Sequence, residues 1–446
     1  MLCTECYSLP MLESRRDAGL VRAIGVRGLA TSTINTMVGA GIFVAPGALA
    51  TCMGRSAPIA FILCAIAMGA VTICFAEGGS RVATSGGAYG VIEAAFGPLA
   101  GYIAGTLLWL SDALTCGGIS AALADVVVSV VPQPYKAPTH MMVIIAVIGS
   151  VVVVNLGGVR RGVRLVDWVT TIKMVPLFLF LVVGVTAMHR ANFVQSVASS
   201  GTQSLGRALI LVLFLLTGME VSLSASGEVK QPSRTIPRAL AITLFFVTFL
   251  YIAIQVVAQG MLGASLSQSA VPLADAMARI SPVLRMVMIA GASVSMLGWI
   301  ASDLLSSPRI LFAFGRDGLL PQALGRVHPR THVPHVAILC YAALAMGLAL
   351  TGTFVELAVL ATLAVTVVYA AGSVAAWRLA RDGVAQNGVP LNFRGLTAAM
   401  VVATTSMVIF LAMGSRAEIL GVFAMIGVSG TIYVLQTRLA LAPAKL

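Results

Sequence analysis

Long apolar segments recur along almost the whole chain and restrict its fold more than any other feature. We count twelve, at 23–50, 57–78, 91–131, 139–157, 165–188, 206–227, 236–261, 282–307, 335–352, 355–379, 396–413 and 417–437. Only 10% of the 446 residues are charged, whereas soluble domains carry about 25%. In lipid, a helix satisfies its main-chain polar groups internally. The sequence therefore predicts an all-α integral membrane protein with 12 transmembrane helices.

The formal net charge of +12 comes from basic residues whose distribution fits a membrane topology. With a cytoplasmic N-terminus, 20 of the 28 Lys and Arg residues lie on the cytoplasmic side and 7 on the other. Cytoplasmic loops of membrane proteins carry such an excess. We therefore expect a multi-pass protein of the plasma membrane, the inner membrane in a bacterium, with lipid and not nucleic acid around it. Both termini are expected in the cytoplasm, as tails at 1–22 and 438–446, with no cleavable signal peptide.

The first apolar segment is interrupted by glycine. Gly39 and Gly41 lie in its middle, where a glycine costs about 1 kcal/mol relative to alanine in a helix. Non-helical backbone at membrane depth is tolerated only where it is buried in protein or lines a cavity. The half-helix after Gly41 presents free N–H groups to a carboxylate, and the preceding half ends in free carbonyls suited to an ammonium group. The competing interpretation is close helix packing through small residues.

A second interruption lies in the sixth segment, at 216–220 (LTGME). The two breaks occupy corresponding places in two halves of five helices each, 23–188 and 206–379. Because five is odd, the second half enters the membrane with the opposite orientation. Paired breaks in an inverted repeat indicate the binding site of a secondary transporter. The last two helices, at 396–437, fall outside the repeat, and we expect them to serve packing or a homodimer interface.

Five sequence blocks occur in the order typical of one family: 38–43 (VGAGIF), 85–89 (SGGAY), 95–98 (AFGP), 227–239 (GEVKQPSRTIPRA) and 309–321 (RILFAFGRDGLLP). On these blocks the chain resembles the amino acid–polyamine–organocation (APC) superfamily of transporters over nearly its full length. The resemblance implies a 5+5 inverted repeat with broken first and sixth helices. It also implies that the first, second, sixth and seventh helices rock against the third, fourth, eighth and ninth, with the fifth and tenth as gates.

The resemblance further implies where an amino acid or amine substrate binds. Similar proteins hold the substrate by main-chain groups at both breaks, which here are Val38, Gly39, Ala40, Gly41, Ile42, Thr217 and Gly218. Phe214, one turn before the second break, is expected to occlude the substrate, unless it is an ordinary core or lipid-facing side chain. Trp299 matches a tryptophan that stacks over the substrate in the branch that carries basic amino acids and polyamines.

Charged residues within the segments are rare and costly, at about 2.5–3.5 kcal/mol each at the bilayer centre on insertion scales. Lys173 stands where sodium-coupled relatives bind their cation, so the resemblance implies sodium independence; the alternative is a lysine that reaches the cytoplasmic interface. We expect Lys173 to form an ion pair with Asp303. Glu220 is expected either to exchange protons or to order the unwound segment by accepting main-chain N–H groups.

Two further acidic residues have roles that the sequence leaves open. Asp112, in the third segment, either meets a cationic substrate side chain or bonds a neighbouring helix. Glu228 lies among arginines at the cytoplasmic end of the sixth segment, where we expect a gating or structural salt bridge.

Metal and cofactor sites are not expected. Cys3 and Cys6 form a lone C-x-x-C, and zinc would need two further ligands nearby. His328, His332 and His335 lie between apolar segments, where a solvated loop is the simpler interpretation.

The sequence therefore predicts a sodium-independent transporter of amino acids that works by exchange or with protons. Asp112 and Trp299 favour cationic amino acids or polyamines. A permease for small neutral amino acids and a non-transporting amino acid sensor of the same fold are the alternatives. The major facilitator fold is disfavoured because the loop after the sixth segment is short and 78–81 (GGSR) lacks its charged motif. An enzyme is disfavoured because no nucleophile, metal cluster or phosphate loop is evident.

Overall fold

Helices account for nearly all of the computed structural model, which describes residues 24–39, 41–82, 87–158, 173–193, 202–220, 228–386 and 389–441. The α-helices are α2 (Val26–Met37), α3 (Gly41–Met53), α4 (Ala57–Arg81), α5 (Gly87–Phe96), α6 (Pro98–Val128), α7 (Lys136–Leu156), α9 (Met174–Thr186), α10 (Thr202–Leu216), α12 (Pro232–Leu262), α13 (Pro272–Ala278), α14 (Pro282–Ser306), α15 (Pro308–Arg316), α16 (His335–Thr351), α17 (Phe354–Arg381), α18 (Leu396–Ala412) and α19 (Arg416–Leu441). Short 3-10 helices are η1 (Gly54–Ser56), η2 (Arg190–Phe193), η4 (Gly263–Gln268) and η5 (Gln322–Gly325). The predicted all-α membrane fold is confirmed.

Membrane-spanning length is met by seven stretches within the described ranges, and four shorter apolar helices have 10–17 residues. One of the seven, Gly41–Arg81, contains α3 and α4 joined through η1. Each of the twelve predicted segments overlaps at least one helix. Twelve crossings, and the division of the chain into two repeats and a final pair, stay predictions.

The third predicted segment differs from the expectation of one continuous helix. The structure divides it into α5 and α6 at Gly97, whose φ is +91°. Such a φ is open to glycine and strained for other residues. Pro98 then begins α6, where its missing N–H is not needed. This break is not visible in the hydropathy of the segment, because the residues on both sides of it are apolar.

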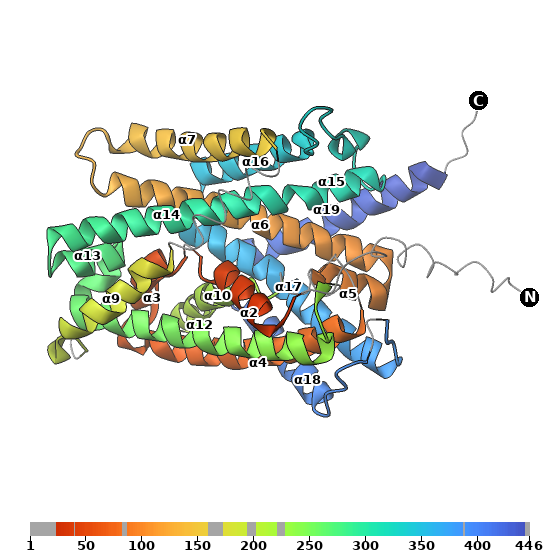
Figure 1. Ribbon diagram of the computed structural model, residues 1–446, viewed down its shortest axis with the longest axis horizontal. Coiled ribbons are helices and arrows are strands. Elements are labelled where there is room, and N and C mark those ends of the chain that lie inside the picture. Colours follow the sequence, from red (N-terminus) through yellow and green to blue (C-terminus); the bar gives the residue numbers. More distant parts are fainter. Residues whose placement is uncertain are drawn as a thin grey trace, which may run out of the picture.

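The long helices form two groups in Figure 1. α6, α7, α14 and α16 pack against one another in the upper half of the view. α4 and α12 pack together in the lower half, and α12 also contacts α2 while α10 contacts α3 and α4. α17 runs between the groups and packs on both α4 and α6. The two groups contain the helices that the resemblance assigns to the moving bundle and to the scaffold.

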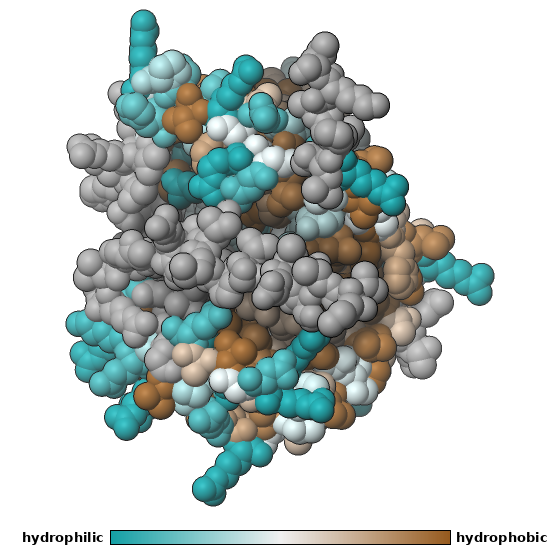
Figure 2. All heavy atoms as spheres, turned by 90° about the vertical axis from the view of Figure 1, so that its right-hand side faces the viewer, coloured by the Kyte–Doolittle hydropathy of each residue, from teal (hydrophilic) through white to brown (hydrophobic). Residues whose placement is uncertain are grey.

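One end of the molecule carries charge. Viewed from the right-hand side of Figure 1, the described surface in Figure 2 shows hydrophilic side chains over much of its area, with hydrophobic ones between them. α4, α15 and α17 all run toward this end and finish with arginines in their last turns. The flanks differ, because helices such as α7 and α12 expose large apolar side chains, among them Met142, Val153, Phe245 and Phe249.

Candidate functional site

A polar cavity of about 440 Å³ lies where α2, α3, α6, α10, α12, α14 and α17 meet. Seven of the predicted substrate contacts line it: Gly39, Gly41, Asp112, Phe214, Thr217, Gly218 and Trp299. So do three of the predicted coupling groups: Lys173, Glu220 and Asp303. Two other cavities have mostly apolar linings. One, of about 750 Å³, lies against α4 and α12. The other, of about 630 Å³, lies against α6 and α19. The polar cavity is therefore the candidate binding site.

The first helix is broken at the cavity, as its glycines predict. α2 ends at Met37 and α3 begins at Gly41. Between them, the N–H of Val38 donates to the carbonyl of Ile34 at 2.8 Å, and that of Gly39 donates to the carbonyl of Met37 at 2.8 Å. The first N–H groups of α3 have no partner within the helix. This wall of the cavity thus offers main-chain groups of both signs.

The two glycines allow side chains to approach this break closely. A Cβ added to Gly39 would lie 3.0 Å from Cδ1 of Trp299. One added to Gly41 would lie 2.6 Å from Cδ2 of Leu215 and 3.2 Å from Cε1 of Phe214. The indole of Trp299 and the phenyl ring of Phe214 therefore pack directly against the break. A side chain at Gly39 or Gly41 would push them away from it.

The second predicted break, at 216–220, lies just after α10. The hydroxyl of Thr217 donates to the carbonyl of Phe214 at 2.7 Å, and Gly218 follows with φ +109°. Glu220 accepts from the N–H of Gly218 at 3.0 Å and from the hydroxyl of Tyr369 at 2.5 Å. Of the two roles expected for Glu220, these bonds fit the ordering of the unwound segment.

Phe214 packs edge-on against Phe354 with ring centroids 5.7 Å apart, and 8% of it is exposed. It faces the cavity and not the outside, so its lipid-facing alternative is wrong.

Lys173 joins the start of α9 to α2. It is 5% exposed, and its ammonium group donates to the main-chain carbonyl of Asn35. The expected ion pair with Asp303 is not formed: no contact within 4 Å joins these two described side chains, and Asp303 is occupied by other donors. A main-chain carbonyl compensates the buried ammonium in place of a carboxylate.

Asp303 and Asp112 meet at a serine that sequence reasoning overlooked. The hydroxyl oxygen of Ser307 lies 2.8 Å from Oδ2 of Asp112 and 2.8 Å from Oδ1 of Asp303. The hydroxyl of Tyr341 donates to Oδ2 of Asp303 at 2.6 Å. Asp112 therefore bonds a neighbouring helix, which was one of its two expected roles. Ser307 stands four residues after Asp303, a spacing that places both on one helix face.

Three fully buried tyrosines were also missed. Tyr251 on α12, Tyr341 on α16 and Tyr369 on α17 are among the largest fully buried side chains. Each hydroxyl donates to a group at the cavity wall: Tyr251 to the carbonyl of Met37 at 2.8 Å, Tyr341 to Asp303 and Tyr369 to Glu220. A buried tyrosine hydroxyl needs a partner, but the sequence does not name it.

The other predicted residues that the structure describes do not line the cavity. Val38 and Ile42 are fully buried, so only their main-chain groups are candidates for contact with a ligand. Ala40 lies outside the described residues. Glu228 is exposed, and its carbonyl accepts from the N–H of Ile24 at 3.0 Å; within the described ranges its side chain forms no salt bridge.

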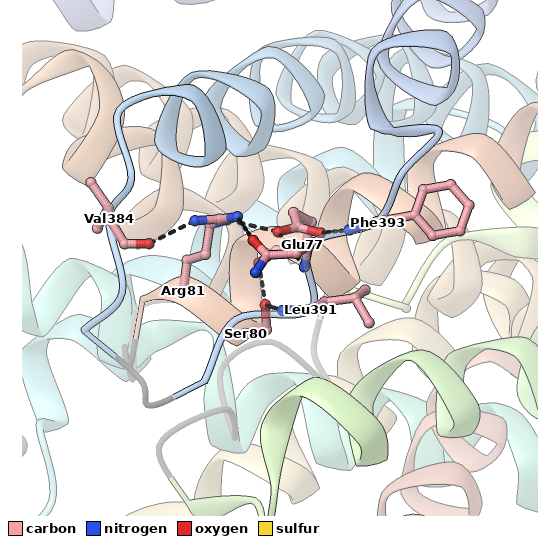
Figure 3. A network of polar contacts seen from close by, with 7 residues as sticks. Glu77, Ser80, Arg81, Val384, Leu391 and Phe393 are labelled. Carbon is pink, nitrogen blue, oxygen red and sulfur yellow. Dashed lines mark hydrogen bonds and ion pairs between the residues drawn. The ribbon is translucent and has the colours of Figure 1, made fainter.

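A second polar network, at the end of α4, was not predicted. Glu77 and Arg81 form an ion pair at 2.7 Å. Figure 3 shows both residues joined to the segment between α17 and α18. Glu77 is 0% exposed and accepts from the N–H groups of Asn392 and Phe393. Arg81 donates to the carbonyl of Val384 at 2.9 Å. The i, i+4 spacing of the pair was readable from the sequence, but its distant partners were not.

The rings of His328 and His335 lie edge-on to each other, with centroids 5.5 Å apart. Nδ1 of His328 accepts from the N–H groups of Arg330 and Thr331, each at 3.3 Å, so the ring organises its own turn. Among the described residues, no three His, Cys, Asp or Glu side chains group as metal binding requires. Cys3 and Cys6 lie outside them.

A helical membrane protein with one helix interrupted at a polar cavity, and a second ending there, belongs to the class of solute transporters. The family model described as amino acid permease matches residues 24–434. The chain belongs to this amino acid permease family.

The names of similar proteins agree with that membership. The chain is 29% identical to the serine/threonine exchanger SteT of Bacillus subtilis over 341 residues, which cover 74% of this chain and 77% of the relative. It is 26% identical to the branched-chain amino acid permease BcaP of Lactococcus lactis, over 67% and 69% of the two chains. An uncharacterized transporter of Mycobacterium tuberculosis is 28% identical over 77% of each chain. These names describe transport and not catalysis.

Proposed function

We propose that the protein transports neutral amino acids across the plasma membrane by alternating access, without sodium. The observation that carries this proposal is the state of the cavity's carboxylates. Asp112 is bonded to Ser307, Asp303 to Ser307 and Tyr341, and Glu220 to Gly218 and Tyr369. A cationic side chain would have to compete with these donors, whereas a neutral side chain would not.

The broken helices suit the two charges that every amino acid carries. The substrate carboxylate would lie at the N-terminus of α3, where free N–H groups and the helix dipole favour an anion. The ammonium group would lie at the C-terminal end of α2, where the last carbonyls and the helix dipole favour a cation. A cavity of about 440 Å³ is within the range of small-molecule sites.

The relatives support a neutral substrate. One is named for serine and threonine and another for branched-chain amino acids. The preference for cationic amino acids or polyamines expected from Asp112 and Trp299 has no support from them. Trp299 rests against Gly39, where it would cover the substrate's main-chain end whatever its side chain.

Lys173 supports sodium independence. The resemblance assigns its position to the cation of sodium-coupled transporters, and its ammonium group already bonds the carbonyl of Asn35. A sodium ion there would add a positive charge beside a buried one. The two packed helix groups supply the parts that alternating access needs, and the basic excess would face the cytoplasm.

Counterflow in proteoliposomes tests the proposal. Vesicles preloaded with unlabelled serine, valine, lysine or putrescine would be diluted into the same labelled compound, with sodium or with choline outside. We expect counterflow of at least one neutral amino acid, equal in both media. Counterflow of lysine or putrescine alone, or a requirement for sodium, would contradict the proposal. Binding without any flux would indicate a sensor.

A further inference from the structure

We infer that Asp112 and Asp303 hold one proton between them through Ser307, and that this carboxyl pair is a proton-binding site in the wall of the cavity. The inference rests on the proposed transport function and adds the coupling ion to it. Asp112 and Asp303 come from different helices, α6 and α14, of the same packed group.

The geometry of Ser307 requires the proton. Its oxygen lies 2.8 Å from a carboxyl oxygen of Asp112 and 2.8 Å from one of Asp303. A serine hydroxyl has one hydrogen and therefore donates one hydrogen bond at a time. If both carboxyls were ionised, one of the contacts would place two lone pairs against each other. A proton on one carboxyl turns that contact into a second hydrogen bond.

The surrounding donors locate the proton on Asp112. Asp303 accepts a further hydrogen bond, from the hydroxyl of Tyr341 at 2.6 Å. Hydrogen bonds to an ionised acceptor are stronger than those to a neutral one, so this donor favours Asp303 as the carboxylate. Asp112 has Ser307 as its hydrogen-bond partner. The chain of donation then runs from Asp112 to Ser307 and from Ser307 to Asp303.

The proton can leave into the cavity. Asp112, Asp303 and Ser307 all line it. On release, the O–H bond of Asp112 breaks and the proton passes to a water molecule, while Ser307 keeps its hydrogen for one of the two carboxylates. The wall of the cavity then carries one more negative charge, and two anions share a single hydroxyl. The protonated state is therefore the one that presents one fewer negative charge to a zwitterion in the cavity.

Other ionisable groups face the pair from the packed elements: Cys116 on α6, Tyr341 on α16, Lys173 at the start of α9, Glu220 after α10 and Tyr369 on α17. Glu220 is already bonded to Tyr369, and Lys173 is already bonded to the carbonyl of Asn35. Farther groups on the packed helices have contacts of their own or are exposed: His140 with Asp125, Arg285 with Asp275, Arg316 with Asp317, and Arg309 at the surface.

Amino acid accumulation with the membrane potential clamped at zero tests the inference. An inward pH difference of about one unit allows about tenfold accumulation at one proton per substrate. We expect wild-type protein to accumulate its neutral amino acid toward this ratio in empty vesicles. Asp112→Asn keeps a donor toward Ser307 but cannot release a proton, so its accumulation ratio should fall to about one even where counterflow persists. Asp382→Asn, at an exposed aspartate, is the matched control and should accumulate as wild type does.

Infrared spectroscopy supplies a readout that does not need transport. At neutral pH the wild-type protein should show the C=O band of a protonated carboxylic acid, and Asp112→Asn should lose it. Ser307→Ala should shift the band, whereas Ser293→Ala, whose hydroxyl bonds the carbonyl of Ile289 on the same helix, should not.

The two failures are distinguishable. No counterflow of a neutral amino acid by wild-type protein contradicts the proposed function. Counterflow with no pH-driven accumulation, or a carboxylic acid band that persists in Asp112→Asn, overturns the proton site and leaves the proposed function standing.

Discussion

The hydroxyl of Tyr251 on α12 donates to the carbonyl of Met37, at 2.8 Å, at the point where the first transmembrane helix stops. An interrupted helix frees carbonyl oxygens that would otherwise accept from the next turn. The tyrosine therefore compensates part of the break from a neighbouring helix, and it does so at the wall of the cavity.

Tyr251→Phe should weaken substrate binding. The substitution keeps the ring and removes one hydrogen bond, worth about 0.5–1.5 kcal/mol, which corresponds to about 2–13-fold in affinity. We expect KM for counterflow to rise by that factor. Tyr135→Phe, at an exposed tyrosine before α7, is the control. An unchanged KM in Tyr251→Phe would show that the hydrogen bond from Tyr251 is not needed to hold the break in its binding geometry.

Lys173→Met should abolish or strongly reduce transport. The substitution keeps an unbranched side chain and removes the hydrogen bond to the carbonyl of Asn35. Hydrogen bonds to charged groups contribute about 1.5–3 kcal/mol, or about 10–150-fold. Adding sodium should not restore activity, because no sodium site is proposed. Lys230→Met, at an exposed lysine, should transport as wild type does. Sodium-dependent rescue of Lys173→Met would indicate that the lysine stands in a latent sodium site.

Gly41→Ala should raise KM or lower the rate. Its Cβ would lie 2.6 Å from Leu215 and 3.2 Å from Phe214, so both side chains must move from the break. Overpacking costs about 1–3 kcal/mol, equal to about 5–150-fold in affinity. Gly149→Ala on α7 is the matched control, because nothing lies within 4 Å of its Cβ. Equal kinetics for the two variants would show that Gly41 has no role in the shape of the site.

Glu77→Ala should destabilise the protein far more than it alters substrate affinity. Breaking a buried ion pair by removing one partner costs about 3–5 kcal/mol, and here two main-chain N–H groups also lose their acceptor. Thermal unfolding in detergent should show a clear loss. Asp382→Ala, which breaks the exposed Arg378–Asp382 pair, should cost about 0–1 kcal/mol. Similar unfolding temperatures for both variants would contradict the structural role of Glu77.

Both helix breaks were predictable because glycine in an apolar run is a local signal. Gly39, Gly41 and Gly218 stand where α2, α3 and α10 end or begin. The break at Gly97 was equally local, since Pro98 follows it, yet hydropathy alone did not reveal it.

Partners across helices were not predictable from single residues. Burial of Lys173 demands a partner, but a main-chain carbonyl serves as well as a carboxylate, so the pairing with Asp303 was wrong. Ser307 and Asp112 are 195 residues apart, and no spacing rule connects them. The tyrosines had no distinguishing pattern, because an aromatic residue in an apolar helix is ordinary core until its hydroxyl finds a partner.

The network at the end of α4 limits how the helices can move. Besides the bonds from Glu77 and Arg81, Ser80 accepts from the N–H of Leu391, and the carbonyl of Arg81 accepts from the N–H of Gln386. α4 and the chain that leaves α17 are therefore cross-linked, so neither end can move independently of the other. Any tilt of α4 carries the start of α18 with it or bends α17 along its length. In a rocking cycle, the end of α17 would then move with α4, although α17 also packs on α6 of the other group.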